Sequence, residues 1–167
     1  HLSIRRQRQM CIRDRVLPGE APLSYVKRVT QLKLEAALQR LKARNLPKGP
    51  VLCADTTVAL GREILGKPEN AQDALRILKK LSGHTHRVLT AVAMGEGKRR
   101  VSSVSISSVT FANMTPAELK AYVASGEPMG KAGAYGVQGL AAAHISAIKG
   151  SYCLLYTSPS PRDAHES

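Results

Sequence analysis

The feature that most constrains the fold is an apolar run, VLCADTTVAL, at positions 51–60. It is rich in β-branched residues and Gly61 follows it, which predicts a buried β-strand. Asp55 is the one charged residue in the run. A buried carboxylate is costly without a partner, so Asp55 either accepts hydrogen bonds from a nearby turn or faces a cleft, where it holds a divalent metal or deprotonates water. The pattern alone leaves both readings open.

Helical and strand patterns alternate on both sides of this run. Apolar spacing and capping signals predict three helices, over Leu23–Asn45, over Ala71–Leu81 behind the N-cap Asn70, and from the Thr115–Glu118 capping box to Ala124. Gly61–Gly66 marks a short hairpin-like return, and further strands are predicted over 88–94, 101–111 and 142–148. The alternation predicts an α/β fold with a mixed, twisted sheet flanked by helices.

A formal net charge of +13 on 167 residues favours a partner that carries phosphates. Charge alone does not separate a nucleotide from a nucleic acid. One Phe, five Tyr and no Trp argue against a platform on which single-stranded bases stack. The core of such a chain has to be built from aliphatic side chains, as in many α/β domains with buried strands.

The cysteine pattern indicates a reducing compartment. Cys11, Cys53 and Cys153 are an odd set without close spacing, which gives neither a disulfide framework nor a zinc site. The sequence contains no apolar stretch long enough to span a bilayer and no apolar core of a signal peptide. We therefore expect a soluble, cytoplasmic protein without a membrane partner.

The two ends of the sequence differ from its middle. Residues 1–15 and 153–167 do not continue the periodic patterns between them, and the second segment turns into Ser/Pro-rich sequence. Both resemble translated sequencing adapters, so we interpret them as non-native flanks around a partial domain at 16–152. A basic arm and a flexible tail are the alternative. Without the flanks the net charge is still +10, from +13 − 4 + 1.

Polar residues at three further places are candidates for substrate binding. Lys33 lies on the first predicted helix, and Lys67 stands in Gly66-Lys67-Pro68. An ammonium group is a compact charge suited to phosphate, although either lysine could be a solvated surface cation. The segment 125–139 holds five glycines with Lys131 and Gln138 among them. Such glycine density implies close backbone approach, and a Gln amide can pair with a pyrimidine edge.

The histidines at 84 and 86 form an H-x-H pair just after the second predicted helix. Such a pair can ligate a metal from one face of a strand. A third ligand is not apparent nearby in the sequence, so a polar turn is the favoured interpretation.

Taken together, these segments resemble the Maf family of nucleotide pyrophosphatases, in the branch that acts on dTTP and UTP. Order and spacing agree from Val16 to Tyr152. The stretches that carry the resemblance are YVKR at 25–28 leading to Lys33, ADTTV at 54–58, GKP at 66–68, LSGHTH at 81–86, YVASGEP at 122–128, KAGAYGVQG at 131–139 and GSY at 150–152.

The resemblance implies a fold similar to inosine triphosphate pyrophosphatases. It also implies cleavage of a nucleoside triphosphate to the monophosphate and pyrophosphate with Mg²⁺ or Mn²⁺, a homodimer, and no specific nucleic-acid partner. The implied roles are Asp55 as catalytic base and metal ligand, Thr56 and Gln138 in base selectivity, and Lys33, Lys67 and Lys131 in substrate binding.

The sequence also departs from the family pattern. A Ser-x-Ser-Pro-Arg-Arg phosphate loop has no match in residues 1–15, Gly130 replaces an acidic residue, and the family's Gly-Leu-Pro segment and final helix do not follow Tyr152. Glu20 lies too close to the first helix to replace the family's other acidic residue. We therefore expect little or no turnover. The alternatives are a catalytically inactive nucleotide-binding regulator of cell division and a basic nucleic-acid-binding module.

Overall fold

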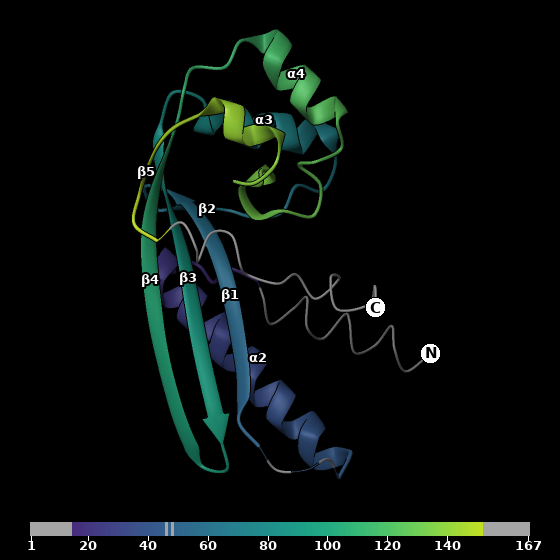
Figure 1. Ribbon diagram of the computed structural model, residues 1–167, viewed down its shortest axis with the longest axis vertical. Helices are drawn as coiled ribbons and strands as arrows, with labels where there is room; N and C mark the ends of the chain where they lie inside the picture. The colour runs from purple at the N-terminus through teal and green to yellow at the C-terminus, as the bar shows by residue number, and fades with distance from the viewer. Residues whose placement is uncertain (1–14, 46, 48, 152–167) are drawn as a thin grey trace. The chain divides into compact units, whose positions relative to one another are not determined.

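The computed structural model describes residues 15–45, 47 and 49–151 (Figure 1). Its elements are, in chain order, α2 (Pro22–Ala43), β1 (Val51–Leu60), β2 (Glu63–Leu65), α3 (Ala71–Leu81), β3 (Thr85–Glu96), β4 (Arg99–Phe111), α4 (Pro116–Ala124), the 3₁₀ turns η1 (Ala132–Ala134) and η2 (Leu140–His144), and β5 (Ile145–Lys149). The strands of these residues form a sheet in the order β2-β1-β3-β4-β5. This confirms the α/β class predicted from the sequence.

The strands pair in antiparallel fashion, so the mixed character expected of the sheet was wrong. Strand β2 pairs antiparallel with β1, and β5 with β4. Only Gly97 and Lys98 separate β3 from β4, and so short a connection joins antiparallel strands only. The arrows of β1 and β3 also run in opposite directions in Figure 1. The apolar patterns predicted where strands lie but carried no information on their directions.

Most predicted elements have the bounds that the sequence suggested. The strand 51–60 and the helix 71–81 agree at both ends, and the Thr115 capping box is present. Strand β3 extends beyond the predicted 88–94 at both ends, and at its C-terminal end it continues into the hairpin turn with β4. Strand β5 begins at Ile145 rather than 142, since the preceding residues form η2.

The chain folds into two compact units. Of the described residues, unit 1 comprises those in the ranges 15–55 and 91–104, and unit 2 comprises residues 56–90 and 105–151. Among the described residues, unit 1 holds α2, the first half of β1 and the tip of the β3–β4 hairpin. The predicted flanks, Arg15 aside, lie outside the described residues.

In unit 1, helix α2 covers one face of the strands (Figure 1). It buries Val26, Val29 and Leu34. A Cβ on Gly95 of β3 would lie 3.1 Å from Leu38 of the helix, so the backbone of that strand approaches α2 closely. Residues 52 and 54 of β1 are exposed while their neighbours are half-buried. This alternation turns the odd-numbered residues of β1, Asp55 included, toward α2.

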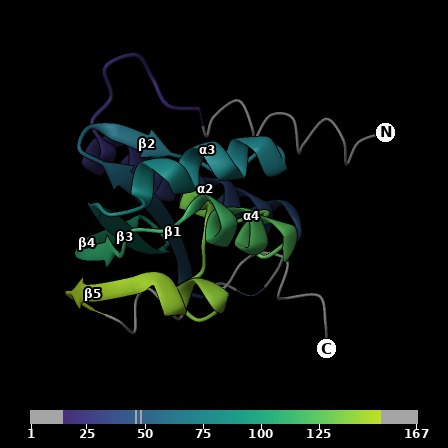
Figure 2. The same cartoon turned by 90° about the horizontal axis from the view of Figure 1, so that it is seen from above.

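Unit 2 has its own apolar core. Helices α3 and α4 lie side by side, as the view in Figure 2 shows. Local signals fix their starts: the Asn70 side chain accepts a hydrogen bond from the Asp73 N–H, and Thr115 and Glu118 form a reciprocal capping box. Beneath them aliphatic residues surround a few aromatic ones, with Leu78, Phe111 and Tyr135 among the buried members.

Candidate functional site

Lys33 of α2 and Asp55 of β1 form an ion pair within unit 1. The two side chains are 27% and 18% exposed, so solvent and small ions still reach them. A carboxylate inside an apolar strand needs a partner, and Lys33 is that partner for Asp55. The two residues are 22 positions apart in the sequence, and the packing of α2 on β1 brings them together.

Cys53 is the next odd-numbered residue of the same strand. Burial raises the pKa of its thiol, and the positive charge of Lys33 opposes that effect only in part. The thiol is therefore protonated near neutral pH. It adds no negative charge beside the Lys33–Asp55 pair.

The donor set around Asp55 determines which kind of metal site it fits. In residues 15–45, 47 and 49–151, no three His, Cys, Asp or Glu side chains gather closely enough to hold an ion. Glu20 is engaged with Arg28, whose Nε donates to Oε1 at 2.6 Å and Nη2 to Oε2 at 2.8 Å. These hydrogen bonds lower the pKa of the Glu20 carboxyl. Asp55 thus offers a single carboxylate, which fits a hard divalent cation whose other ligands are not protein side chains, but not an all-protein cage.

In unit 2, the segment that contains Lys67 is tied to the glycine-rich loop. The N–H of Gly133 donates to the Gly66 carbonyl oxygen at 3.0 Å. Gly133 has a φ of +72°, and a Cβ there would lie 2.8 Å from the Val58 side chain. Only glycine meets both conditions. The loop therefore lies directly against β1 and the residue that precedes Lys67.

Thr56 begins the part of β1 that belongs to unit 2. Its hydroxyl lies 3.1 Å from that of Thr90 on β3, within hydrogen-bond distance. Thr90 is buried, and its position on a strand is fixed. This contact restricts the orientation of the Thr56 side chain.

Lys131 and Gln138 are exposed residues of the loop. The Lys131 ammonium donates to the Glu127 carbonyl oxygen at 2.7 Å, an interaction within the loop itself. Gln138 stands inside a four-residue turn that the Gly139 N–H closes on the Gly136 carbonyl at 3.2 Å. Both side chains are placed by the loop and not by a regular helix or strand.

Sequence reasoning missed Glu127, the residue around which this loop is organised. The density of glycines indicated close backbone approach to some partner, and that partner is in part this carboxylate. A Cβ on Gly139 would lie 2.2 Å from Glu127 Oε1. An acidic residue within a glycine-rich segment was the available signal.

The H-x-H pair does not form a metal site. His86 is buried, where its Nε2 shares a hydrogen bond of 2.7 Å with the Tyr135 hydroxyl and its ring stacks on Phe111. Burial lowers the pKa of His86 to about 4, so its imidazole is neutral. The exposed His84 instead places Nδ1 2.8 Å from the Ser82 carbonyl oxygen. The polar-turn interpretation therefore fits His84 but is wrong for His86, which is a buried residue of β3.

The predicted site residues thus fall into two groups. Lys33 and Asp55 meet in unit 1, and Thr56, Lys67, Lys131 and Gln138 belong to unit 2. Asp55 and Thr56 are consecutive residues of β1. None of the helices in the described part of the chain is both long and apolar enough to cross a membrane.

Comparison with known proteins gives a consistent result. The sequence model of a family described as "Maf: Maf-like protein" matches residues 5–155. That range reaches into both predicted flanks, whose boundaries stay a prediction. A relative from Polaromonas sp. is 63% identical over 139 residues, which cover 83% of this chain and 69% of the relative.

Two further relatives show how far the similarity extends. One from Albidiferax ferrireducens is 64% identical, over 83% of this chain and 70% of its own length. One from Chromobacterium violaceum is 44% identical, over 84% of this chain and 71% of its own length. All three relatives carry the name dTTP/UTP pyrophosphatase.

Proposed function

Since this chain belongs to the Maf family, we propose that it hydrolyses dTTP or UTP to the nucleoside monophosphate and pyrophosphate. The names of its relatives support the reaction and the substrate class. The observation that carries the proposal is the Lys33–Asp55 ion pair, because it places a carboxylate and an ammonium together in a half-buried, accessible position. Water attack on a phosphoric anhydride requires a group that accepts a proton and a cation that neutralises phosphate.

In the proposed reaction, Asp55 orients a water molecule and takes its proton. The water oxygen bonds to the α-phosphorus, the bond from that phosphorus to the oxygen bridging to the β-phosphate breaks, and pyrophosphate leaves with the bonding electrons. Lys33 and Lys67 neutralise the triphosphate, and their charge counts most in the transition state.

We also propose that the reaction uses a divalent cation, Mg²⁺ or Mn²⁺, and that Asp55 is its protein ligand. A bound cation would neutralise phosphate oxygens and lower the pKa of a coordinated water. A single carboxylate agrees with the way Mg²⁺ binds beside nucleotide phosphates, with the remaining positions filled by phosphate oxygens and water. In this scheme Lys33 is released from Asp55 and its ammonium becomes available to the triphosphate.

Base selectivity is assigned to Thr56 and Gln138 of unit 2. An amide offers both a donor and an acceptor, which matches the edge of uracil or thymine. The fixed hydroxyl of Thr56 supports the same role, since Thr90 holds its orientation. Lys131 is a further candidate for substrate binding. Its ammonium donates a hydrogen bond to the Glu127 carbonyl oxygen of the same loop.

The test is pyrophosphate release from dTTP and UTP with Mg²⁺, compared with purine triphosphates. We expect preference for the two pyrimidine substrates, and loss of release in Asp55→Asn. The matched control is Glu63→Gln, which removes a carboxylate from the surface ion pair with Lys80 and should leave release unchanged.

Equal loss in both variants would contradict the role of Asp55. Nucleotide binding without release in the parent chain would support the inactive regulator instead. The same assay measures whether turnover is as low as the sequence leads us to expect. The homodimer and the cytoplasmic location are proposals as well, and sedimentation at several protein concentrations tests the first.

A further inference from the structure

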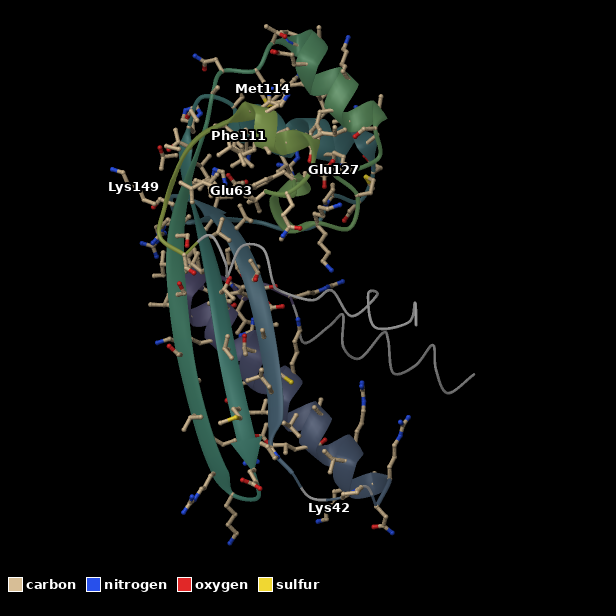
Figure 3. All side chains as sticks on the ribbon, viewed as in Figure 1. Lys42, Glu63, Phe111, Met114, Glu127 and Lys149 are labelled. Carbon is tan, nitrogen blue, oxygen red and sulfur yellow. The ribbon has the colours of Figure 1, made fainter. Side chains whose placement is uncertain are left out.

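Glu127 lies in the segment that follows α4, at the start of the glycine-rich loop (Figure 3). Its carboxylate is directed into the protein. Oε1 accepts a hydrogen bond from the Tyr122 hydroxyl at 2.8 Å, and Oε2 accepts one from the Leu140 N–H at 2.8 Å. The nearby N–H of Ala141 also contributes to the lowered pKa of this carboxyl. One side chain thus joins the end of α4 to the far end of the loop.

The charge state of Glu127 agrees with this position. Burial by itself would raise the pKa of the carboxyl, but the hydrogen bonds from Leu140, Tyr122 and Ala141 outweigh it and the pKa lies below its ordinary value. The group is therefore a carboxylate at neutral pH. Its oxygens accept hydrogen bonds from uncharged donors, which stabilise the ionised form.

The two glycines on either side of Gln138, Gly136 and Gly139, lie close to the side chains of Lys131 and Glu127. A Cβ on Gly139 would lie 2.2 Å from Glu127 Oε1, and one on Gly136 would lie 3.2 Å from Cε of Lys131. The Lys131 ammonium in turn donates to the Glu127 carbonyl oxygen. The turn that carries Gln138 is thus packed against Glu127 and Lys131, and its glycines permit that approach.

We propose that Glu127 is a positioning residue that holds the Gln138 turn in the conformation that reads the pyrimidine base. The inference rests on the proposed function and deepens it, because it assigns base selectivity to a residue that touches the loop and not the substrate. A residue with this role acts on substrate affinity and discrimination, while the water-attack step, assigned to Asp55, is unaffected.

The experiment compares Glu127→Gln with Glu118→Gln in steady-state kinetics. The first variant keeps the size of the side chain, but one of its two terminal atoms becomes an NH₂ group, so it cannot accept both hydrogen bonds. The second removes a carboxylate that caps α4 and whose hydrogen bonds are made with Thr115. For Glu127→Gln we expect KM for dTTP to rise about tenfold, kcat to stay within about threefold, and the preference for dTTP over dCTP to fall several-fold, by the loss of preorganisation. Glu118→Gln should lower thermal stability without changing KM for dTTP, kcat or the preference for dTTP over dCTP.

Two further measurements distinguish a positioning role of Glu127 from a folding defect. Tyr122→Phe removes one donor and retains the carboxylate, so it should produce a smaller change of the same kind even if Glu127→Gln folds poorly. Hydrogen exchange of residues 131–142 without nucleotide should be faster in Glu127→Gln than in Glu118→Gln, whether or not the chain hydrolyses dTTP.

The outcomes separate the two claims. No pyrophosphate release by the parent chain contradicts the proposed function, while exchange still decides whether Glu127 orders the loop. Unchanged exchange and unchanged KM in a folded Glu127→Gln variant overturn the positioning role. A loss confined to thermal stability, equal in the two glutamate variants, overturns it as well.

Discussion

Two carboxylates, one in each unit, have partners of opposite character. Asp55 in unit 1 is paired with the ammonium of Lys33, the end of a flexible side chain that is 27% exposed. Glu127 in unit 2 is held by the Leu140 backbone N–H and the Tyr122 hydroxyl. The first partner can move away when a stronger anion arrives, whereas the backbone donor is fixed by the fold.

This difference indicates which carboxylate is available for chemistry. An ion pair near solvent is worth little on its own, so exchanging Lys33 for a metal or a phosphate costs little. Displacing the Glu127 carboxylate would leave the hydroxyl of the buried Tyr122 without its acceptor, which costs more. Asp55 is therefore suited to the reaction and Glu127 to the architecture of the loop.

Lys33→Gln is expected to have the largest effect. If Lys33 transfers its charge from Asp55 to the triphosphate, its loss should lower kcat/KM by about 100-fold, as for the removal of one donor that stabilises a transition state. Steady-state pyrophosphate release measures the change, and thermal unfolding should be nearly unaltered. A drop in stability with normal kcat/KM would mean that the ion pair is structural, and the contrast with Glu127 would disappear.

Gly139→Ala tests whether the Glu127 carboxylate is held in place by its donors. The new methyl group would displace the Glu127 carboxylate from its donors, so we expect a loss of about 2 kcal/mol in the free energy of unfolding. Denaturant unfolding measures it. Gly49→Ala is the matched control, because a Cβ there meets no atom within 4 Å. Equal stability of the two variants would show that the Glu127 carboxylate moves freely.

Acid titration of stability distinguishes Glu127 from an ordinary glutamate. The folded-state pKa of Glu127 lies below the ordinary value of 4.5. The ionised carboxylate therefore contributes fully to the free energy of unfolding above pH 4.5, and this contribution is lost as the pH falls through the folded-state pKa. Glu127→Gln should therefore flatten the acid limb of unfolding free energy against pH. An unchanged acid limb would contradict the hydrogen bonds assigned to this carboxylate.

Lys80→Gln should have the smallest effect. Lys80 pairs with Glu63 on the surface of unit 2, at side-chain exposures of 37% and 47%. We expect less than about 1 kcal/mol in unfolding free energy, the usual range for exposed pairs, and no change in pyrophosphate release. An activity loss as large as that of Lys33→Gln would mean that overall charge, and not the position of Lys33, governs turnover.

The sequence predicted helix starts well, because a helix start depends on residues that are neighbours in the chain. Asn70 and Thr115 each mark a helix start because their side chains satisfy N–H groups within the next turn. The directions of the strands and the extra length of β3 could not be predicted this way, because they depend on hairpin pairing between residues that the periodicity does not connect.

The site shows the same division. Asp55 could be singled out because a carboxylate in an apolar strand demands a partner, but the identity of that partner depends on the rotation of α2 over β1. Glu127 escaped detection because its donors, Tyr122 and Leu140, come from opposite ends of a loop. No pattern in the sequence indicates that these ends meet.

The sequence by itself determined the α/β class, the positions of the capped helices and the motifs that place the chain in its family, because each depends on residues close together in the chain. Only the tertiary structure decided that the sheet is antiparallel, that Lys33 neutralises Asp55 and that Glu127 organises the Gln138 turn. Those contacts join residues from different elements, and they exist only once apolar burial has brought the elements together.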